Sequence, residues 1–234
     1  MPPPYTTTIR TADRDHAPAI AELLAEAFLH GDLAPWLIPH LDTRARIYPS
    51  YFALLTEQAL DHGHVEVAGD GTGVTAVAIW YPIGGGPPPA APNYDTRLAA
   101  ITGPYVHRFT ALDDAMHRHH PYDTWHHYLA FLAVHPDRQH RGLGSALLGH
   151  YHTVLDDHAT PAYLEATGSR NARLYARHGY RPRTAYRVHG DGPALYPMWR
   201  APASVHGFDD NPGSHVLHLR ADTHPHRSQG GRNE

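Results

Sequence analysis

The stretch YLAFLAVHPDRQHRGLGS, residues 128–145, decides the fold. Its first seven residues are almost wholly apolar, which is typical of a strand buried on both faces of a sheet. A turn with two glycines follows, and a helix is predicted over residues 143–157. Such a turn exposes bare backbone N–H groups at the positive end of a helix dipole. It is a candidate pyrophosphate site, to which Arg138 and Arg141 add positive charge.

The two glycines alone are explained equally well by a tight turn with close packing. Two other phosphate-binding loops are excluded. No Gly-Lys-Ser/Thr follows, so the Walker pattern is absent. The Rossmann pattern lacks one glycine here, and its strand would lie past the middle of the chain.

Strands and helices are predicted on both sides of this stretch. Downstream, a strand over 162–166 and a helix over 171–178 make a strand–helix–strand unit, which predicts a right-handed parallel crossover. A last strand is predicted over 194–200. Upstream, the pattern predicts a strand over 6–12, then a helix capped by Asp13 or Asp15 and ended by Gly31, and a second helix over 43–62. A hairpin of strands 64–68 and 73–81 and a loop over 82–92 should follow. Residues 94–119 should form one or two helices, broken near Gly103-Pro104.

The composition limits the classes of function. The chain has 234 residues and no cysteine, which excludes disulfides, thiolate nucleophiles and cysteine-bound zinc. A formal net charge of −4 argues against general nucleic-acid binding. The start of the chain lacks the pattern of a signal peptide, and no apolar run reaches the length of about 20 residues that spans a bilayer. We therefore expect a cytoplasmic protein that binds neither membrane nor nucleic acid.

Histidine is unusually frequent, with 23 residues. Protonation of all of them would raise the net charge from −4 to +19, so charge and solubility should change between about pH 5 and pH 7. Several histidines cluster, but no His-Glu-x-x-His pattern occurs, and we expect no catalytic metal. Residues 1–200 are expected to form one domain. Residues 201–234 are expected to be a largely disordered tail, in which 215–221 has the pattern of an edge strand.

Two segments together resemble the coenzyme A signature of the GNAT N-acetyltransferases. The first is Gln139-x-x-Gly142-x-Gly144, preceded by Val-His-Pro and followed by Ala-Leu-Leu. The second, RNARLYARHGY at residues 170–180, resembles the family's Asn…Leu-Tyr-Glu-Lys-x-Gly-Phe segment. The resemblance covers about residues 6–200, and it is nearest to antibiotic-modifying enzymes of the puromycin N-acetyltransferase type. It implies an α/β fold with a central mixed sheet, flanked by helices, whose central parallel strands splay apart.

The resemblance also implies acetyl-CoA, or another acyl-CoA, as co-substrate. The pantetheine arm would lie between the splayed strands and pair with backbone groups of the first, and the pyrophosphate would sit on the amides of the glycine turn. Asn171 would contact the arm or order water, and Tyr175 would lie near the thioester sulfur. The implied contacts are Phe131, Leu132, Ala133, Val134, Arg138, Gln139, His140, Arg141, Gly142, Leu143, Gly144, Ser145, Asn171 and Tyr175.

Two residues are candidates for acid–base catalysis of attack by a neutral amine on the thioester. A phenol with an ordinary pKa near 10 stays protonated at neutral pH, so Tyr175 suits the acid that protonates the departing thiolate. Its alternative role is packing of its helix against the sheet. Glu165 is a carboxylate in an otherwise apolar strand, a setting that raises the pKa and suits a base. The alternative is that Glu165 points to solvent or into a salt bridge.

The acceptor amine is expected to contact Glu26, His30, Asp32, Trp80 and Tyr81. The resemblance places the first three there, where they could recognise the amine or accept its proton, and carboxylates suit a cationic substrate. For each of these three the alternative is a surface role. The two aromatic residues are part of a set that could wall a pocket or form ordinary core: Tyr48, Tyr51, Trp80, Tyr81, Tyr105 and Trp125.

The predicted activity is therefore transfer of an acetyl group from acetyl-CoA to a primary amine of a small molecule, such as an antibiotic or a natural-product intermediate. The expected enzyme is a monomer or a homodimer. Two alternatives stay open. One is a biosynthetic acyltransferase that uses a larger acyl-CoA or an acyl carrier protein. The other is a GNAT-like module that binds acetyl-CoA without catalysis.

Overall fold

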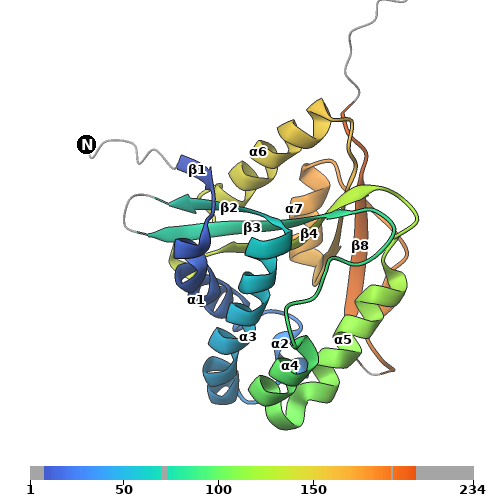
Figure 1. Ribbon diagram of the computed structural model, residues 1–234. Coiled ribbons are helices and arrows are strands. Elements are labelled where there is room, and N and C mark those ends of the chain that lie inside the picture. Colours follow the sequence, from blue (N-terminus) through green and yellow to red (C-terminus); the bar gives the residue numbers. More distant parts are fainter. Residues whose placement is uncertain (1–7, 70–72, 191, 204–234) are drawn as a thin grey trace, which may run out of the picture.

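The computed structural model describes residues 8–69, 73–190 and 192–203, and these form a twisted mixed sheet with helices on both faces (Figure 1). The strand order is β1-β2-β3-β4-β5-β8-β6, and β7 also pairs with β8. The strands are β1 (Thr8–Thr11), β2 (His64–Gly69), β3 (Val74–Ile83), β4 (His126–Val134), β5 (Ala162–Ala166), β6 (Arg181–Pro182), β7 (Tyr186–Arg187) and β8 (Ala194–Arg200).

The helices divide between the two faces. One layer packs over Val77, Ile79 and Tyr81 of β3, and the other packs over Ala76, Ala78 and Trp80, because successive side chains of a strand point to opposite faces. The first layer comprises α1 (Ala17–Phe28), α2 (Ala34–Leu37), α3 (Leu41–His62), α4 (Tyr94–Thr102) and α5 (Val106–His119). The second layer comprises α6 (Leu143–Asp157) and α7 (Ser169–Arg177). Short 3₁₀ turns span Arg14–His16, Gly103–Tyr105 and Pro136–Arg138.

The central parallel pair, β4 and β5, separates soon after it begins. The only paired positions are His127 with Ala162 and Tyr128 with Tyr163, among the residues that the structure describes. The register of β4 against β3 shifts between Leu129 and Phe131, which leaves Ala130 as an extra residue. A bulge of this kind bends a strand and raises its local twist. The bulge therefore accounts for the divergence of β4 from β5. Central parallel strands that splay apart were expected from the family resemblance.

Most predicted elements are confirmed. The connection between the parallel strands β4 and β5 passes through α6, whose bounds match the prediction, and the 94–119 segment is two helices with a break at Gly103. Asp13 caps the 3₁₀ turn that leads into α1, accepting from the N–H of Asp15. The strands β6 and β7 and the four-residue α2 were not predicted, since each is too short to show a period. Residues 215–221 and most of the predicted tail lie outside the described residues.

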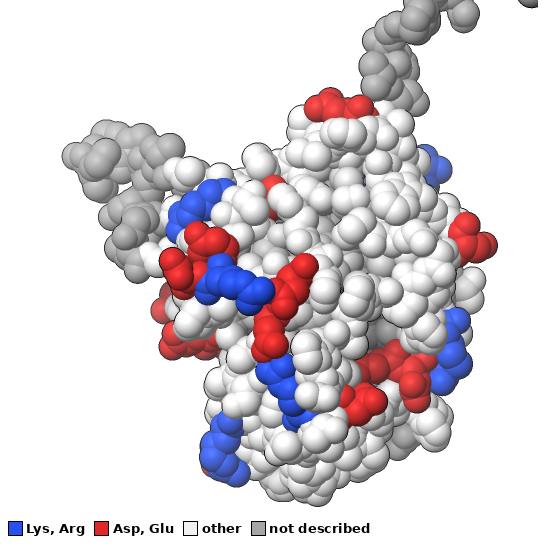
Figure 2. Space-filling model, in the orientation of Figure 1, with Lys and Arg blue, Asp and Glu red and all other residues white. Residues whose placement is uncertain are grey.

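None of the helices in the described ranges combines the length and the apolar character that crossing a bilayer requires. Acidic and basic side chains are interspersed on the face shown in Figure 2, and they do not merge into one extended basic patch there.

Candidate active site

A cavity of about 270 Å³ opens where β4 and β5 diverge. Its floor includes Phe131 and Leu132 of β4, Glu165 of β5, and Asn171 and Tyr175 of α7. Its walls come from the first helical layer and are mostly apolar and aromatic: Phe28, Leu33, Ala34, Leu37, Tyr48, Tyr51, Phe52, Leu55, Leu112 and Met116. The structure thus brings the predicted pantetheine strand, the predicted base and the predicted acid into one space.

Glu165 is held in this space by tyrosine hydroxyls. Its Oε1 accepts hydrogen bonds from the Tyr163 hydroxyl at 2.9 Å and from the Tyr186 hydroxyl at 3.2 Å. Its Oε2 is buried, and no partner for it is found among the described residues. Burial raises the pKa of Glu165 to about 7, and the nearby hydroxyls of Tyr163, Tyr128 and Tyr186 oppose that shift. A carboxyl with this pKa is half ionised near neutral pH, which is what a general base needs.

Tyr175 lies on α7 beside the same cavity. Its ring packs edge-on against Tyr180, with centroids 5.9 Å apart. Burial raises the pKa of its phenol, so the hydroxyl keeps its proton at neutral pH. Asn171, one turn earlier, donates from Nδ2 to Thr167 Oγ1 at 3.5 Å.

The glycine turn has the geometry that an anion site requires. Gly142 precedes α6 with φ +83°, and His140 also has a left-handed φ of +62°. The helix begins its hydrogen bonding with Ala146 N donating to Gly142 O, so the earlier amides of its first turn have no partner within the helix. A side chain at Gly142 would meet nothing within 4 Å. Open space, unused amides and the helix dipole together fit a pyrophosphate.

Side chains around this turn are also ordered. Arg170 Nη2 lies 2.7 Å from His140 Nε2, which joins α7 to the turn. Gln139 Nε2 donates to Val134 O at 3.3 Å, which fixes the turn against the end of β4.

Comparison with known proteins identifies the fold and the family. A model of the GNAT acetyltransferase domain matches residues 109–182. A Corynebacterium glutamicum protein, described as histone acetyltransferase HPA2 and related acetyltransferase, is 31% identical with a TM-score of 0.65. The match covers 84% of this chain and 97% of that one. The chain belongs to the GNAT acetyltransferase family.

Other GNAT structures share the fold at lower identity. An agmatine N-acetyltransferase is 15% identical, with a TM-score of 0.52 and coverage of 83% of this chain and 99% of the other. A mosquito arylalkylamine N-acetyltransferase-like protein is 17% identical, with a TM-score of 0.51 and coverage of 84% and 100%. At this identity the likeness concerns the fold alone.

The residues predicted to bind the acceptor of this GNAT enzyme are only partly brought together. Asp32 and Tyr81 line the cavity. Glu26 Oε2 instead lies 3.0 Å from His135 Nε2, so that α1 is paired with the start of the glycine turn. His30 is exposed and is not among the lining residues. Trp80 is fully buried on the opposite face of β3, where its ring lies tilted against that of Tyr151 of α6, and so it does not line the cavity.

Of the predicted aromatic set, Tyr48, Tyr51 and Tyr81 line the cavity, while Tyr105 and Trp125 do not. Asp32 has a second close neighbour. A side chain added at Gly168, just before α7, would collide with the Asp32 carboxylate. Asp32 therefore lies against the N-terminal end of α7, where a negative charge is favoured by the helix dipole.

The sequence analysis missed one charged residue of the cavity, Asp113 of α5. A signal for it exists. Phe109, Leu112 and Met116 occupy one face of α5 at helical spacing, and Asp113 falls within that apolar face. A carboxylate on a face that packs inward indicates a functional role more strongly than one on the exposed face.

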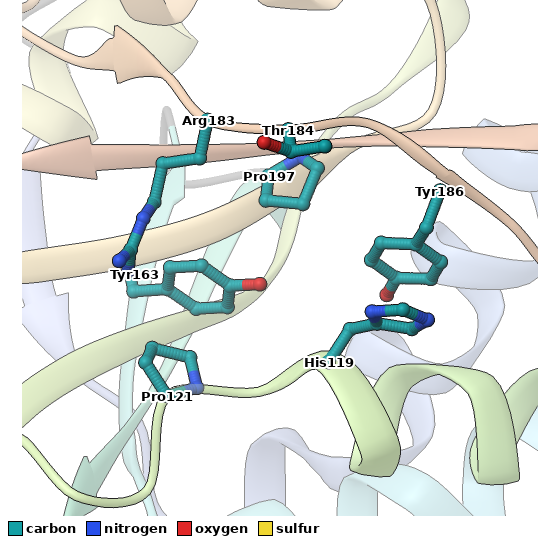
Figure 3. A pocket seen from close by; sticks show the side chains of 7 residues that line it. All are labelled: His119, Pro121, Tyr163, Arg183, Thr184, Tyr186 and Pro197. Atoms are coloured by element: carbon teal, nitrogen blue, oxygen red, sulfur yellow. The ribbon is translucent and has the colours of Figure 1, made fainter.

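A second pocket, of about 420 Å³, is lined by Tyr163 and Tyr186, the two tyrosines whose hydroxyls donate to Glu165. Figure 3 shows Tyr163 and Tyr186 across it from each other, with Arg183 and Thr184 from the segment between β6 and β7. His119 at the end of α5 stacks on the Tyr186 ring, with centroids 4.0 Å apart. Among the described residues, no three His, Asp or Glu side chains gather closely enough to hold a metal ion.

Proposed function

We propose that this GNAT enzyme transfers an acetyl group from acetyl-CoA to a primary amine of a small molecule, by direct attack in a ternary complex. The observation that carries the proposal is the meeting of three groups around one cavity: Phe131 and Leu132 on the part of β4 that is not paired with β5, Glu165, for whose Oε2 no hydrogen bond is found among the described residues, and Tyr175.

The residues present suit a coenzyme A thioester. The amides from Gln139 to Gly144 would hold the pyrophosphate, and the unpaired edge of β4 from Phe131 to Val134 would pair with the pantetheine arm. Arg138 and Arg141 would add charge beside it. When bound, the thioester supplies an activated acetyl group. The chain itself must then position the amine, accept a proton from it, and donate a proton to the departing thiolate.

Glu165 would accept the proton of the acceptor amine, directly or through one water. Tyr163 and Tyr186 both donate to Oε1, and no hydrogen bond to the buried Oε2 is found among the described residues, which leaves a lone pair there for that proton. Ionised carboxylates at Glu165 and Asp32 also favour entry of an ammonium over a neutral or anionic acceptor. A hydroxyl that is protonated at neutral pH suits the opposite task, and Tyr175 would give its proton to the departing thiolate.

The shape of the cavity supports a small acceptor. Its volume is near the lower end of ordinary small-molecule sites, and most of its walls are apolar or aromatic. An amine attached to an apolar body, including the amines of antibiotics and natural-product intermediates, fits this description.

A thiol-release assay with acetyl-CoA and a panel of primary amines tests the proposal. We expect release that depends on both reactants and yields the acetylated amine by mass spectrometry. Binding of acetyl-CoA without release for any small amine would contradict it, as would release that requires a protein acceptor. Replacement of acetyl-CoA by longer acyl-CoA donors in the same assay compares the acyl groups.

A further inference from the structure

The cavity carries negative charge at more than one place. Glu165 lies on β5 and Asp113 on α5, and both line the cavity together with Asp32. Among the described residues that line it, none is arginine or histidine, and the chain has no lysine. A cavity with several carboxylates and no cation of its own attracts a positively charged ligand.

No arginine or histidine partner of the Asp113 carboxylate is found among the described residues. Its Oδ2 accepts a hydrogen bond from the Tyr94 hydroxyl at 2.9 Å, the one hydrogen bond found for it among the described residues. Burial, together with the nearby Asp114 and Asp95, raises the pKa of Asp113 to about 6 against the opposing effect of the Tyr94 hydrogen bond. An ionised, half-buried carboxylate in such surroundings is stabilised by a cation that binds from the cavity.

The two carboxylates lie at different parts of the cavity. Tyr94, the partner of Asp113, is electrostatically coupled to Tyr81 of β3. Tyr81 pairs with Tyr128 of β4, which in turn pairs with Tyr163 of β5, beside Glu165. Where the strands are paired, two strand spacings, about 10 Å, separate β3 from β5, and β5 diverges from β4 beyond that point. The cavity that both carboxylates line is walled by aromatic rings, including Tyr51, Phe52 and Phe131, which pack against one another.

We propose that the acceptor is a diamine, or another primary amine with a second cationic group at the far end of an apolar chain, and that Asp113 binds that second cation. The inference rests on the proposed function, since Glu165 must face the reacting amine. The two carboxylates distinguish the ends of such a molecule. Glu165 removes a proton from the near end so that it can react, and Asp113 holds the far end charged. The aromatic walls contact the apolar chain and, through their π faces, both cations.

Matched acceptors and a matched variant test this inference. Asp113→Asn keeps the size of the side chain and an oxygen that accepts from Tyr94. Asp114→Asn removes a neighbouring carboxylate that is exposed and lies outside the cavity. The wild type and both variants are assayed with unbranched α,ω-diamines of increasing length and with the monoamine of each length.

We expect wild-type kcat/KM to favour a diamine over its matched monoamine at one preferred length. Asp113→Asn should lower the diamine value about 10-fold or more, as expected for loss of a half-buried ion pair, and leave the monoamine value nearly unchanged. Asp114→Asn should leave the preference in place. Equal losses for both acceptors in Asp113→Asn, or an unchanged preference, would overturn the inference.

A binding readout separates this inference from the proposed function. If no amine is acetylated, the proposed function fails, and thermal shifts of the three proteins with the same diamines and monoamines still test Asp113. A diamine-specific shift lost only in Asp113→Asn would retain the cation site. The absence of any diamine-specific shift in the wild type would remove it.

Discussion

Glu165 owes its chemistry to where its two oxygens lie. Tyrosine hydroxyls fix Oε1, and Oε2 is buried without a partner among the described residues. Desolvation favours the neutral form of a carboxyl, and here it raises the pKa to about 7. A small change in pH near neutrality therefore changes the fraction of the protein in which Glu165 is ionised.

The first prediction concerns the pH dependence of Glu165. Because a base acts in its ionised form, kcat/KM should rise with pH through an apparent pKa near 7. Glu165→Gln should abolish that inflection and lower kcat by about 100-fold or more, since it removes the proton acceptor but keeps an oxygen for the tyrosines. Initial rates of thiol release between pH 5 and pH 9 measure both effects.

Stability provides an independent check on the same residue. A carboxyl whose pKa is higher in the folded than in the unfolded protein stabilises fully below the unfolded value, and that stability is lost as pH rises through about 7. Glu165→Gln should thus unfold at a higher temperature than the wild type at pH 8, with the difference shrinking toward pH 5. A variant that is less stable at every pH would show that the carboxylate is structural.

The second prediction concerns Tyr175. Tyr175→Phe keeps the ring against Tyr180 and removes only the hydroxyl, so it should lower kcat on the order of 100-fold with little change in KM. Tyr196→Phe is a matched control, because Tyr196 is exposed and does not line the cavity. Steady-state kinetics of the two variants test the assignment. Full activity of Tyr175→Phe across the pH range would exclude the acid role.

At the scale of elements, the turn before α6 depends on one backbone conformation. Gly142 has a left-handed φ, which costs a residue with a Cβ about 1 kcal/mol or more, although the Cβ itself would meet no atom. The amides that face the proposed pyrophosphate are set by that conformation. A substitution that strains the backbone at Gly142 should therefore weaken coenzyme A binding.

The third prediction compares two glycines of α6: Gly142, which precedes the helix, and Gly149, which lies within it. Gly142→Ala should weaken coenzyme A binding several-fold and destabilise the protein by about 1 kcal/mol. Gly149→Ala, in the exposed middle of α6, should stabilise it by about 1 kcal/mol and leave binding unchanged, because alanine is the better helix former. Calorimetric titration with coenzyme A and thermal unfolding measure the two effects. Equal binding by both variants would show that the turn does not hold the nucleotide.

Elements with a clear period could be predicted, and the bounds of α6 show why. Its apolar residues recur at helical spacing and a glycine marks its start. The strands β6 and β7 have two residues each, so their pairing with β8 is decided by tertiary contacts alone. The face of β3 on which Trp80 lies was likewise not visible in sequence, since alternation separates two faces without saying which one meets the cavity.

At the scale of the whole molecule, burial of histidine governs the response to acid. Desolvation lowers the pKa of His120 and His152 to about 3 and that of His127 to about 4. These side chains stay neutral in the fold between pH 5 and pH 7. The folded protein therefore gains less positive charge in that window than the count of histidines alone suggested.

The fourth prediction is a loss of stability from pH 7 to pH 5. A histidine with a lowered pKa stabilises the fold above its unfolded pKa, and that contribution is lost as pH falls, because the unfolded chain binds the proton. After allowance for solvent screening, the three histidines together should cost on the order of 3 kcal/mol at pH 5. Protonation of Glu165 opposes this loss, so Glu165→Gln should lose more stability than the wild type. Denaturant unfolding at both pH values tests this, and equal stability at both would contradict it.

The motif of the proposed coenzyme A site is local in sequence, and so the turn, Asn171 and Tyr175 could be proposed from their own segments. The proposed acceptor side of the cavity could not be predicted in the same way. It is assembled from α1, α3, α5 and β5, and Asp113 meets Glu165 in one cavity only after the helical layer has packed on the sheet. Residues that are far apart in the chain and carry no common motif show their relation only in the fold.

The most direct test of the central claim is thiol release from acetyl-CoA by the wild type and Glu165→Gln, measured across pH with one accepted small amine. The account predicts amine-dependent release in the wild type that rises through an apparent pKa near 7, and a low, flat profile in the variant. A wild-type profile that the substitution leaves unchanged in height and shape would contradict it.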